Sequence, residues 1–509
     1  MPAKVCADLL ITEFLADNSN GLADEDLQFS DWIEIHNNGP DPADLGGLFL
    51  TDDPALPARW EIPSFVLGAG EYTVIFASGK DRVGTELHTN FRLNRDGEYL
   101  ALVDADGATV LHEYAPMFPP QDNDRSFGLV EPVAGAPQAA FGSPTPGAAN
   151  DVSSAPGERV GFSPTSRAFS GSIQVSLTAN SPTAQIRYTT NGTAPTASSA
   201  LYASPITLNT STRLRAQIFE PGRPPGPVAS ETYISADAGA MNATSNLPIV
   251  LLENFGGGKP NADTEAMIMI FDRDPETGLA SMSGEPQMAT RCRIRVRGSS
   301  TAGEAKYSMV WEAWDEFNAD KDVTPLGMPE ESDWILSGRY HWDQTLIHNE
   351  FMYSLSNQIG RYASRTRFVE LYFNTGGGTF SSGDYFGVYS IQEKIKRDGD
   401  RVDVERLPDD DDTLPAISGG YVTKIDRADP GDVGFPAAAQ TIRWVYPKEQ
   451  EVTTAQRNYL QGYFNDFYAA LQSPNFYEPD TGYEKYIDVD SWIDHHILNT
   501  IPKNSTPSA

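Results

Sequence analysis

Arginine occupies every second position from Arg291 to Arg297, in the segment RCRIRVRG. On a β-strand this alternation puts the four guanidinium groups on one face and the intervening Cys, Ile and Val side chains on the core face. Guanidinium groups match the geometry of phosphate oxygens, so the segment is a candidate for phosphate binding, with Arg297 its first member. The alternative is a solvated sheet face whose arginines pair with acidic residues on neighbouring strands.

The arginine segment runs directly into small residues, in GSSTAGEAKY. The backbone amides around Gly298, Ser299 and Ser300 can approach an anion closely, and Lys306 follows just beyond them. The spacing matches neither the Walker phosphate loop nor the glycine-rich loop of protein kinases, and a plain hairpin is the alternative.

Three other polar clusters are more typical of solvated structure than of chemistry. The segment EAWDEFNADKDVTPLG misses the EF-hand spacing and its terminal glutamate, which favours an acidic turn over a calcium site. The run Asp409–Asp412 is typical of a solvated loop. His495 and His496 are neighbours and would lie on different faces of a helix, and no HExxH pattern supports zinc. We therefore predict no metal site.

These residues must be positioned by a long, acidic chain that contains little cysteine. Its 509 residues suggest about three domains. The net charge of −33 argues against binding to nucleic acid or to an anionic membrane surface. Cys6 and Cys292 lie far apart, which excludes a disulfide framework and a cysteine-built zinc site. No apolar run of about 18 residues predicts a membrane span. The first residues do not resemble a signal peptide, so an exported form would carry one outside this sequence.

Residues 1–133 read as short strands separated by turns, which predicts an immunoglobulin-like β-sandwich. The strand-like segments include LLITEFLADN, SDWIEIHN, EYTVIFAS and EYLALVDADGATVLHEY, and Asp106-Gly107 in the last is a strong hairpin signal. The Pro-, Ala- and Gly-rich residues 134–159 predict an extended linker. Residues 160–236 predict a second sandwich, because SIQVSLTA and TRLRAQIF alternate apolar and polar positions.

Residues 245–509 predict an α+β domain. The first helix follows Asp343 as its cap, and it ends at Gly360. The second begins at Thr453 or Thr454, ends before Pro474, and carries an inward stripe. The third begins near Asp490 and contains Trp492, Ile493 and Ile497. Strands are predicted at FVELYF and YFGVYSIQEKI. The stripe of the first helix comprises Ile347, Phe351, Leu355 and Ile359, and that of the second comprises Leu460, Phe464, Phe467 and Leu471.

Each of the three modules resembles a known family. The order ITEFLADNSNGLADEDLQFSDWIEIHN, LGGLFLTDD and HTNFRLNRDGEYLALVDADG resembles bacterial lamin-tail domains, which implies an architectural sandwich. The stretch IRYTTNGTAPTASSALYASPITLNTSTRLRAQIF is similar to the small C-terminal domain of chitobiases and β-hexosaminidases, an accessory sandwich without glycosidase activity. The elements RGSS, SDW, RTRFVELYFN and G-x-Y-x-x-x-E, in that order, resemble the CotH kinase family.

The CotH resemblance implies a kinase-like fold that uses ATP and Mg²⁺ to phosphorylate serine residues of partner proteins. Such a reaction needs cations around the phosphates and a carboxylate that orients the reacting groups. Arg297, Lys306 and Lys424 are the candidate cations, and Glu393 of the G-x-Y-x-x-x-E element is the candidate to position a lysine or bind the nucleotide. Each of them has the alternative of an ordinary ion pair.

The last residues, DVDSWIDHHILNTIPKNSTPSA, resemble the helix that in the family leads to its catalytic and metal-binding aspartates. Ser505 or Thr506 occupies the position of the first aspartate, and no Asp-x-Asp segment follows. We therefore expect two sandwiches followed by an α+β kinase-like domain that is C-terminally incomplete and inactive in this form. The expected setting is the cell surface or the exterior, with a protein substrate or a surface component as partner and carbohydrate left open for the sandwiches. The alternative is a non-catalytic surface or matrix scaffold.

Overall fold

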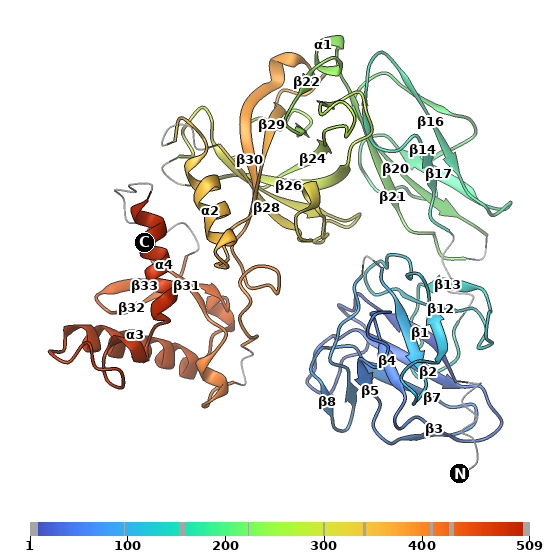
Figure 1. Cartoon of the computed structure of the whole chain (residues 1–509). Coiled ribbons are helices and arrows are strands. Elements are labelled where there is room, and N and C mark those ends of the chain that lie inside the picture. The colour runs from blue at the N-terminus through green and yellow to red at the C-terminus, as the bar shows by residue number, and fades with distance from the viewer. Residues whose placement is uncertain are drawn as a thin grey trace. The chain divides into compact units, whose positions relative to one another are not determined.

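The computed structural model describes residues 9–95, 97–151, 158–221, 223–298, 301–338, 343–407, 411–426 and 432–501. The chain forms two compact units, and the boundary between them passes through the second sandwich. Figure 1 shows the ribbon of the chain coloured from the N-terminus to the C-terminus. The first unit comprises residues 1–165, 174–207 and 212–231, and the second comprises residues 166–173, 208–211 and 232–509. Each unit has a hydrophobic core of its own.

The first module is a sandwich of two main sheets, as its strand and hairpin signals predict. One sheet has the order β13-β12-β1-β2-β7-β9-β8 and the other β11-β10-β4-β5. The first contains β13 (Gln138–Phe141), β12 (Ser126–Leu129), β1 (Leu9–Leu15), β2 (Trp32–Asn37), β7 (Tyr72–Phe76), β9 (Leu87–His88) and β8 (Arg82–Val83). The second contains β11 (Val110–Tyr114), β10 (Leu100–Val103), β4 (Phe49–Thr51) and β5 (Trp60–Glu61), and β3 (Ala43–Asp44) pairs with β6 (Val66–Leu67).

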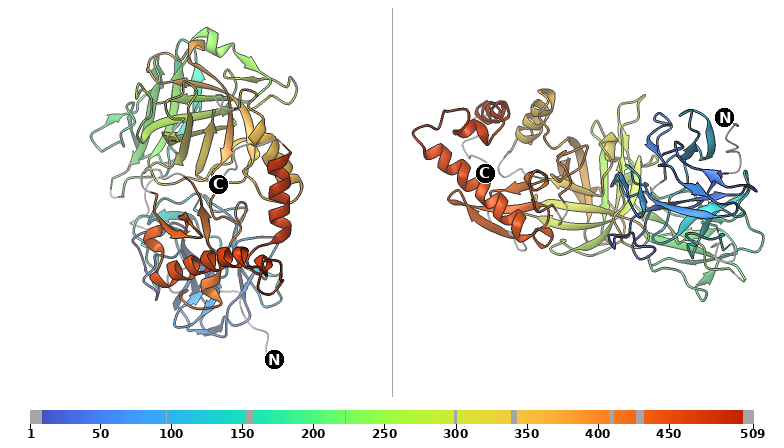
Figure 2. Two further views of the ribbon diagram at one scale, coloured as in Figure 1. Left: turned by 90° about the vertical axis from the view of Figure 1, so that its left-hand side faces the viewer. Right: turned by 90° about the horizontal axis from the view of Figure 1, so that it is seen from below.

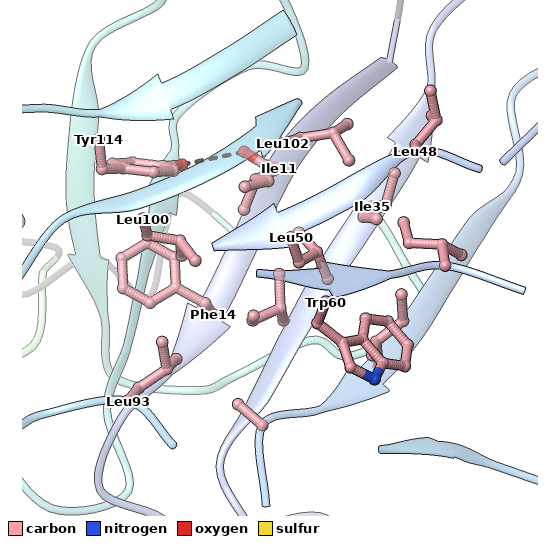
Figure 3. Packing of buried hydrophobic residues seen from close by; sticks show 14 of the residues in the cluster. Ile11, Phe14, Ile35, Leu48, Leu50, Trp60, Leu93, Leu100, Leu102 and Tyr114 are labelled. Atoms are coloured by element: carbon pink, nitrogen blue, oxygen red, sulfur yellow. Dashed lines mark hydrogen bonds between the residues drawn. The ribbon is translucent and has the colours of Figure 1, made fainter. Parts of the chain in front are cut away.

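The core of this sandwich lies between the two sheets (Figure 3). Phe14 and Ile35 from one sheet and Leu50 and Leu102 from the other are completely buried. The hydroxyl of Tyr114 donates a hydrogen bond of 3.0 Å to the backbone oxygen of Ile11, which satisfies the polar end of a buried ring.

The end of the predicted linker belongs to the first sandwich. Strand β13 pairs antiparallel with β12. Beyond it, a tail segment (residues 145–150) docks on two buried carboxylates, Glu13 and Glu34, which lie opposite each other on β1 and β2. The backbone nitrogen of Thr145 lies 3.0 Å from Glu13 Oε2, and that of Gly147 lies 2.7 Å from Glu34 Oε2. Composition predicts an extended linker here, but backbone N–H groups that bind buried acids hold this part of it in place.

The second module confirms the two predicted alternating strands. Strand β16 (Ile173–Thr178) buries Val175 and Leu177, and β20 (Thr212–Phe219) buries Leu214, Ala216 and Ile218. Within the first unit β14 (Gly161–Ser163) pairs with β16, and β17 (Gln185–Thr189) pairs with β18 (Ala200–Leu201) and β20. Within the second unit β15 (Arg167–Phe169) pairs with Tyr233–Ser235 of β21 (Ala229–Ser235) in parallel. Strand β19 (Ile206–Leu208) completes the module.

The third module is built on a closed barrel with the strand order β23-β24-β26-β27-β28-β30-β29. Strands β23 and β29 pair in parallel, and the other neighbours in this order pair antiparallel. The interior contains the stacked rings of Trp311 and Trp334. The strands are β23 (Ile249–Glu253), β24 (Thr264–Phe271), β26 (Met288–Arg297), β27 (Ser308–Trp314), β28 (Asp333–Ser337), β30 (Tyr385–Glu393) and β29 (Thr366–Asn374), with α1 (Ala238–Met241), β22 (Thr244–Ser245) and β25 (Ala280–Ser281) nearby in sequence.

Beyond the barrel, a small sheet of β31 (Val422–Lys424), β33 (Gln440–Tyr446) and β32 (Gly434–Ala437) packs against helix α3 (Thr454–Gln472). Figure 2 shows α3 and α4 (Val489–Thr500) in red from two further sides. Helix α3 begins where the sequence predicts, the side chain of Thr453 caps it, and Leu460 packs on the sheet. Leu471, predicted to face inward, is 43% exposed, because the small sheet reaches only the first part of the helix.

Helix α2 (His348–Gln358) ends just before Gly360, as predicted. Asp343 accepts hydrogen bonds from the backbone of the turn before the helix, including one of 2.8 Å from His348, whereas Ile347 holds the cap position. Phe351 and Ile359 of the predicted stripe are about half exposed. No helix in the described ranges is both long and apolar enough to cross a membrane.

Candidate functional site

Glu393 ends strand β30 and is completely buried. Its Oε2 accepts a 2.8 Å hydrogen bond from the backbone nitrogen of Arg365, and its Oε1 accepts one of 2.9 Å from Arg365 Nε. Arg401 Nε lies 3.9 Å from the same Oε1. Burial, together with the nearby charge of Glu393, raises the pKa of Tyr362 to about 12. Glu393 is therefore an anchored carboxylate whose partners are two arginines.

A second part of this charge cluster surrounds Arg401. The guanidinium of Arg401 lies over the ring of Trp334, 5.1 Å from its centroid, and is 3.6 Å from Glu331 Oε2. Its Nη2 is buried without a hydrogen-bond partner. Glu331 also receives a 2.5 Å bond from Lys396 Nζ. A buried guanidinium with one unmet donor is suited to hold a further acceptor group.

Lysines complete the cluster around Asp333 at the start of β28. Lys394 Nζ lies 2.9 Å and Lys396 Nζ 3.5 Å from Asp333 Oδ2. Burial alone would raise the pKa of Asp333, but the charges and hydrogen bonds of the two lysines outweigh burial and lower it. Burial opposes the charge of Lys396, yet the contact with Glu331 and the charge of Asp333 raise its pKa. Both shifts favour the charged forms, a carboxylate at Asp333 and an ammonium at Lys396.

The basic strand β26 has the predicted alternation, with Cys292 and Ile294 completely buried on the core face. Arg291 Nη2 lies 3.1 Å from Glu265, and Arg293 Nη1 lies 2.6 Å from Asp263. Arg291, Arg293 and Arg295 thus pair with acidic residues on neighbouring segments, Arg295 through a 3.6 Å contact with Asp263. These pairs correspond to the alternative that the sequence left open, a solvated sheet face whose arginines pair with acidic neighbours. Arg297 lies exposed at the end of the strand, and its role in phosphate binding stays a prediction.

Lys306 packs against β30 at the end opposite to Glu393. Its Nζ is 5.0 Å from the ring centroid of Tyr389, and burial lowers its pKa. A Cβ added at Gly387 would sit 3.7 Å from this Nζ. Gly387 and Glu393 are six residues apart on one strand, which is about 20 Å. Lys306 and Glu393 therefore do not form a direct ion pair.

Lys424 lies on β31 in the small sheet, where its Nζ is 2.9 Å from Asp432. Glu393 has arginines as its partners, so neither candidate lysine is paired with it. Ser299 and Ser300 lie outside the described residues. The catalytic role of Glu393 and Lys424 and the binding role of the other candidates stay predictions.

The acidic and histidine clusters have local roles. Asp315 accepts 2.8 Å hydrogen bonds from the backbone nitrogens of Phe317 and Ala319, which makes the acidic segment a turn. His495 Nε2 lies 3.1 Å from Asn499 on the same helix. The run Asp409–Asp412 is described only from Asp411 onward, and Asp412 accepts a 2.5 Å bond from Thr453. Within the described ranges no three His, Cys, Asp or Glu side chains gather in a metal-ligating group.

Sequence reasoning did not identify Arg365 and Arg401, the two residues that hold Glu393. Arg365 opens the RTRFVELYFN element and Arg401 follows in EKIKRDGDR, a segment dense in charge. The sequence signal for both arginines is that they lie in segments rich in arginine and lysine, one before and one after Glu393. Nothing in the spacing pairs residues 365 and 393, because the pairing arises from the antiparallel register of β29 and β30.

The fold and this cluster define a multidomain protein in which β-sandwiches precede an α+β module with a barrel. Family comparisons identify the modules. Residues 2–115 match the Lamin Tail Domain, residues 164–230 match the Chitobiase/beta-hexosaminidase C-terminal domain, and residues 294–505 match CotH kinase protein. These matches confirm the three predicted resemblances and their order. The chain carries a CotH-kinase-like module behind two sandwich modules. A comparison with curated proteins finds no match.

Proposed function

We propose that the CotH-kinase-like module binds ATP and serves the phosphorylation of serine in a partner protein. The match of residues 294–505 to CotH kinase protein carries this proposal. The anchored carboxylate of Glu393 within that region supports it, because a rigid buried acid with arginine partners can position groups around a nucleotide. Arg401 adds a buried guanidinium with an unmet donor.

In the CotH kinase family ATP is used together with magnesium, and magnesium takes oxygen ligands from carboxylates. The described residues supply no cluster of three such ligands. We therefore assign no step to the metal.

Nucleotide binding is tested by thermal unfolding of the full chain with and without ATP. We expect ATP to raise the melting temperature of the wild type and of Glu276→Gln, an exposed control in a turn. We expect Glu393→Gln to lose the shift, because the amide cannot hold Arg365 and Arg401 by charge. An unchanged ATP shift in Glu393→Gln would remove this residue from the site, and no shift in the wild type would refute nucleotide binding.

A non-catalytic scaffold is the second candidate function. It is favoured by strand β26, where Arg291 and Arg293 are engaged by Glu265 and Asp263 instead of facing an open phosphate site. The two proposals separate in one experiment with labelled ATP and a lysate of surface proteins. Label on serine supports the kinase, whereas ATP-independent retention of a surface component without label supports the scaffold.

We further propose that the protein acts at a bacterial cell surface or outside the cell, with the two sandwiches attaching the third module to a protein or carbohydrate component. The accessory nature of both matched sandwich families supports this setting. Protease treatment of intact cells tests it. Loss of the protein without lysis is expected, and full protection until lysis would contradict the proposal.

A further inference from the structure

A polar pocket lies between the end of helix α2 and the start of strand β29. Its volume is about 310 Å³, at the lower end of the range for small-ligand sites. Its lining includes two arginines, and none of the lining residues in the described ranges is acidic. The residues that line it are Ser354, Asn357, Gln358, Ser364, Arg365, Thr366 and Arg367. In a chain of net charge −33, a cavity whose charged lining residues are both arginines is a local exception.

Ser364 supplies an unmet polar group at this pocket. The residue is 1% exposed, and its hydroxyl has no hydrogen-bond partner within the part of the chain that the structure describes. Leaving a buried hydroxyl unsatisfied costs about 1–3 kcal/mol. A ligand oxygen that accepts from Ser364 would remove this cost. The amide of Asn357, by contrast, is occupied by the backbone of Ala363 on both its atoms, at 2.8 Å and 3.0 Å, and so it shapes the wall.

The two arginines differ in how they are held. Arg365 is fixed by its Nε bond to Glu393 and by a bond from Nη2 to the backbone oxygen of Asp400. Arg367 is exposed, and its Nη1 donates a hydrogen bond of 3.0 Å to the backbone oxygen of Thr366. No carboxylate pairs with Arg367 among the residues that the structure describes. This separates it from Arg291 and Arg293, which pair with acids.

We propose that this pocket binds a phosphate monoester. Arg365 and Arg367 both line the pocket, as do Ser364 and Thr366. Guanidinium groups bind phosphate oxygens through paired hydrogen bonds, and the hydroxyls of Ser364 and Thr366 can serve the remaining oxygens. The cavity is larger than a bare phosphate and leaves room for the esterified group. The inference does not rest on phosphoryl transfer by the module.

Calorimetric titration of the full chain at constant ionic strength tests the proposal. The probes are phosphoserine, inorganic phosphate and ATP, with acetate as a carboxylate control. We expect phosphoserine, the phosphate monoester among the probes, to bind and acetate not to bind. The relative affinities of the three phosphate probes show whether the preferred ligand is phosphoserine, free phosphate or a nucleotide. Binding of acetate with equal affinity would overturn the phosphate assignment.

Three variants locate the binding. Arg367→Ala is expected to weaken the phosphate probe at least tenfold, as the loss of a charge-assisted bond does. Ser364→Ala is expected to weaken it several-fold without lowering the melting temperature of the free protein, because the removed hydroxyl has no partner. Arg273→Ala, an exposed arginine in the turn after β24, is expected to bind like the wild type. Failure of phosphoserine to bind, or equal binding by Arg367→Ala, would overturn the proposal.

Discussion

Replacing Glu34 by glutamine should stabilise the first sandwich at alkaline pH. Glu34 is completely buried and lies opposite Glu13 in the register of β1 and β2. Burial raises the pKa of Glu34 from 4.5 to about 8, and the nearby charge of Glu13 acts in the same direction. The hydrogen bonds from Thr12 and Gly147 lower this pKa but do not offset the two effects. Like-charged residues directly opposite each other in a sheet oppose pairing. The protonated form of Glu34 is therefore the stable one in the folded state.

The sign and size of the effect follow from proton linkage. Between pH 4.5 and about 8 the folded state holds a proton on Glu34 that the unfolded chain has released, so stability falls as pH rises through this window. A shift of this size corresponds to roughly 5 kcal/mol at its full extent. Glutamine removes the titration and can retain both hydrogen bonds, by donating to Thr12 Oγ1 and accepting from the nitrogen of Gly147.

We expect Glu34→Gln to raise the unfolding free energy of the first sandwich by roughly 2–4 kcal/mol at pH 8, and to change it little at pH 4. Urea-dependent hydrogen exchange of peptides that cover residues 9–37, corrected for intrinsic rates, measures this in the full chain. Glu61→Gln, an exposed control on β5, should have no comparable effect. A wild type that gains stability from pH 5 to pH 8, or a Glu34→Gln variant that loses stability at pH 8, would refute the reasoning.

Three further changes test other parts of the structure. Gly387→Ala should lower the unfolding free energy of the barrel by about 1–3 kcal/mol, because Gly387 has φ +111; Gly399, which faces open space, is the control, and equal thermal unfolding of both variants would contradict the backbone argument. Arg401→Ala should cost about 3–5 kcal/mol in urea unfolding, since it leaves Glu331 and Glu393 buried beside a lost cation; a loss below about 1 kcal/mol would mean that the cluster is well solvated. Asn150→Ala removes bonds of 3.0 Å to the oxygen of Thr12 and 2.7 Å to that of Leu129, so limited proteolysis between residues 134 and 151 should quicken several-fold, whereas an unchanged cleavage rate would show that the tail segment is held by other contacts.

Local patterns predicted most of the elements. The Asp106-Gly107 signal marks the hairpin of β10 and β11, and Gly107 has φ +69. The alternation in β26 and the cap of α3 are also properties of a few neighbouring residues. Such features depend on backbone preferences and burial within one segment, so a single sequence contains them.

Contacts between distant segments were not predictable in this way. Glu13 and Thr145 are 132 positions apart, and the composition of the tail segment describes only its own backbone. In the same way, the apolar stripe of α2 shows periodicity but not which surface it meets, and Phe351 is 59% exposed. The resemblance to the CotH family named Glu393, whereas the register of β29 and β30 was needed to identify Arg365 as its partner.

Photolabelling with 8-azido-ATP tests the central claim, nucleotide binding by the CotH-kinase-like module, most directly. The full chain is irradiated with the probe, with and without excess ATP, and labelled peptides are located by mass spectrometry. We predict label that ATP suppresses, confined to peptides within residues 294–505 and weakened in Glu393→Gln. Label that ATP does not suppress, or label found only in the two sandwich modules, would contradict the account.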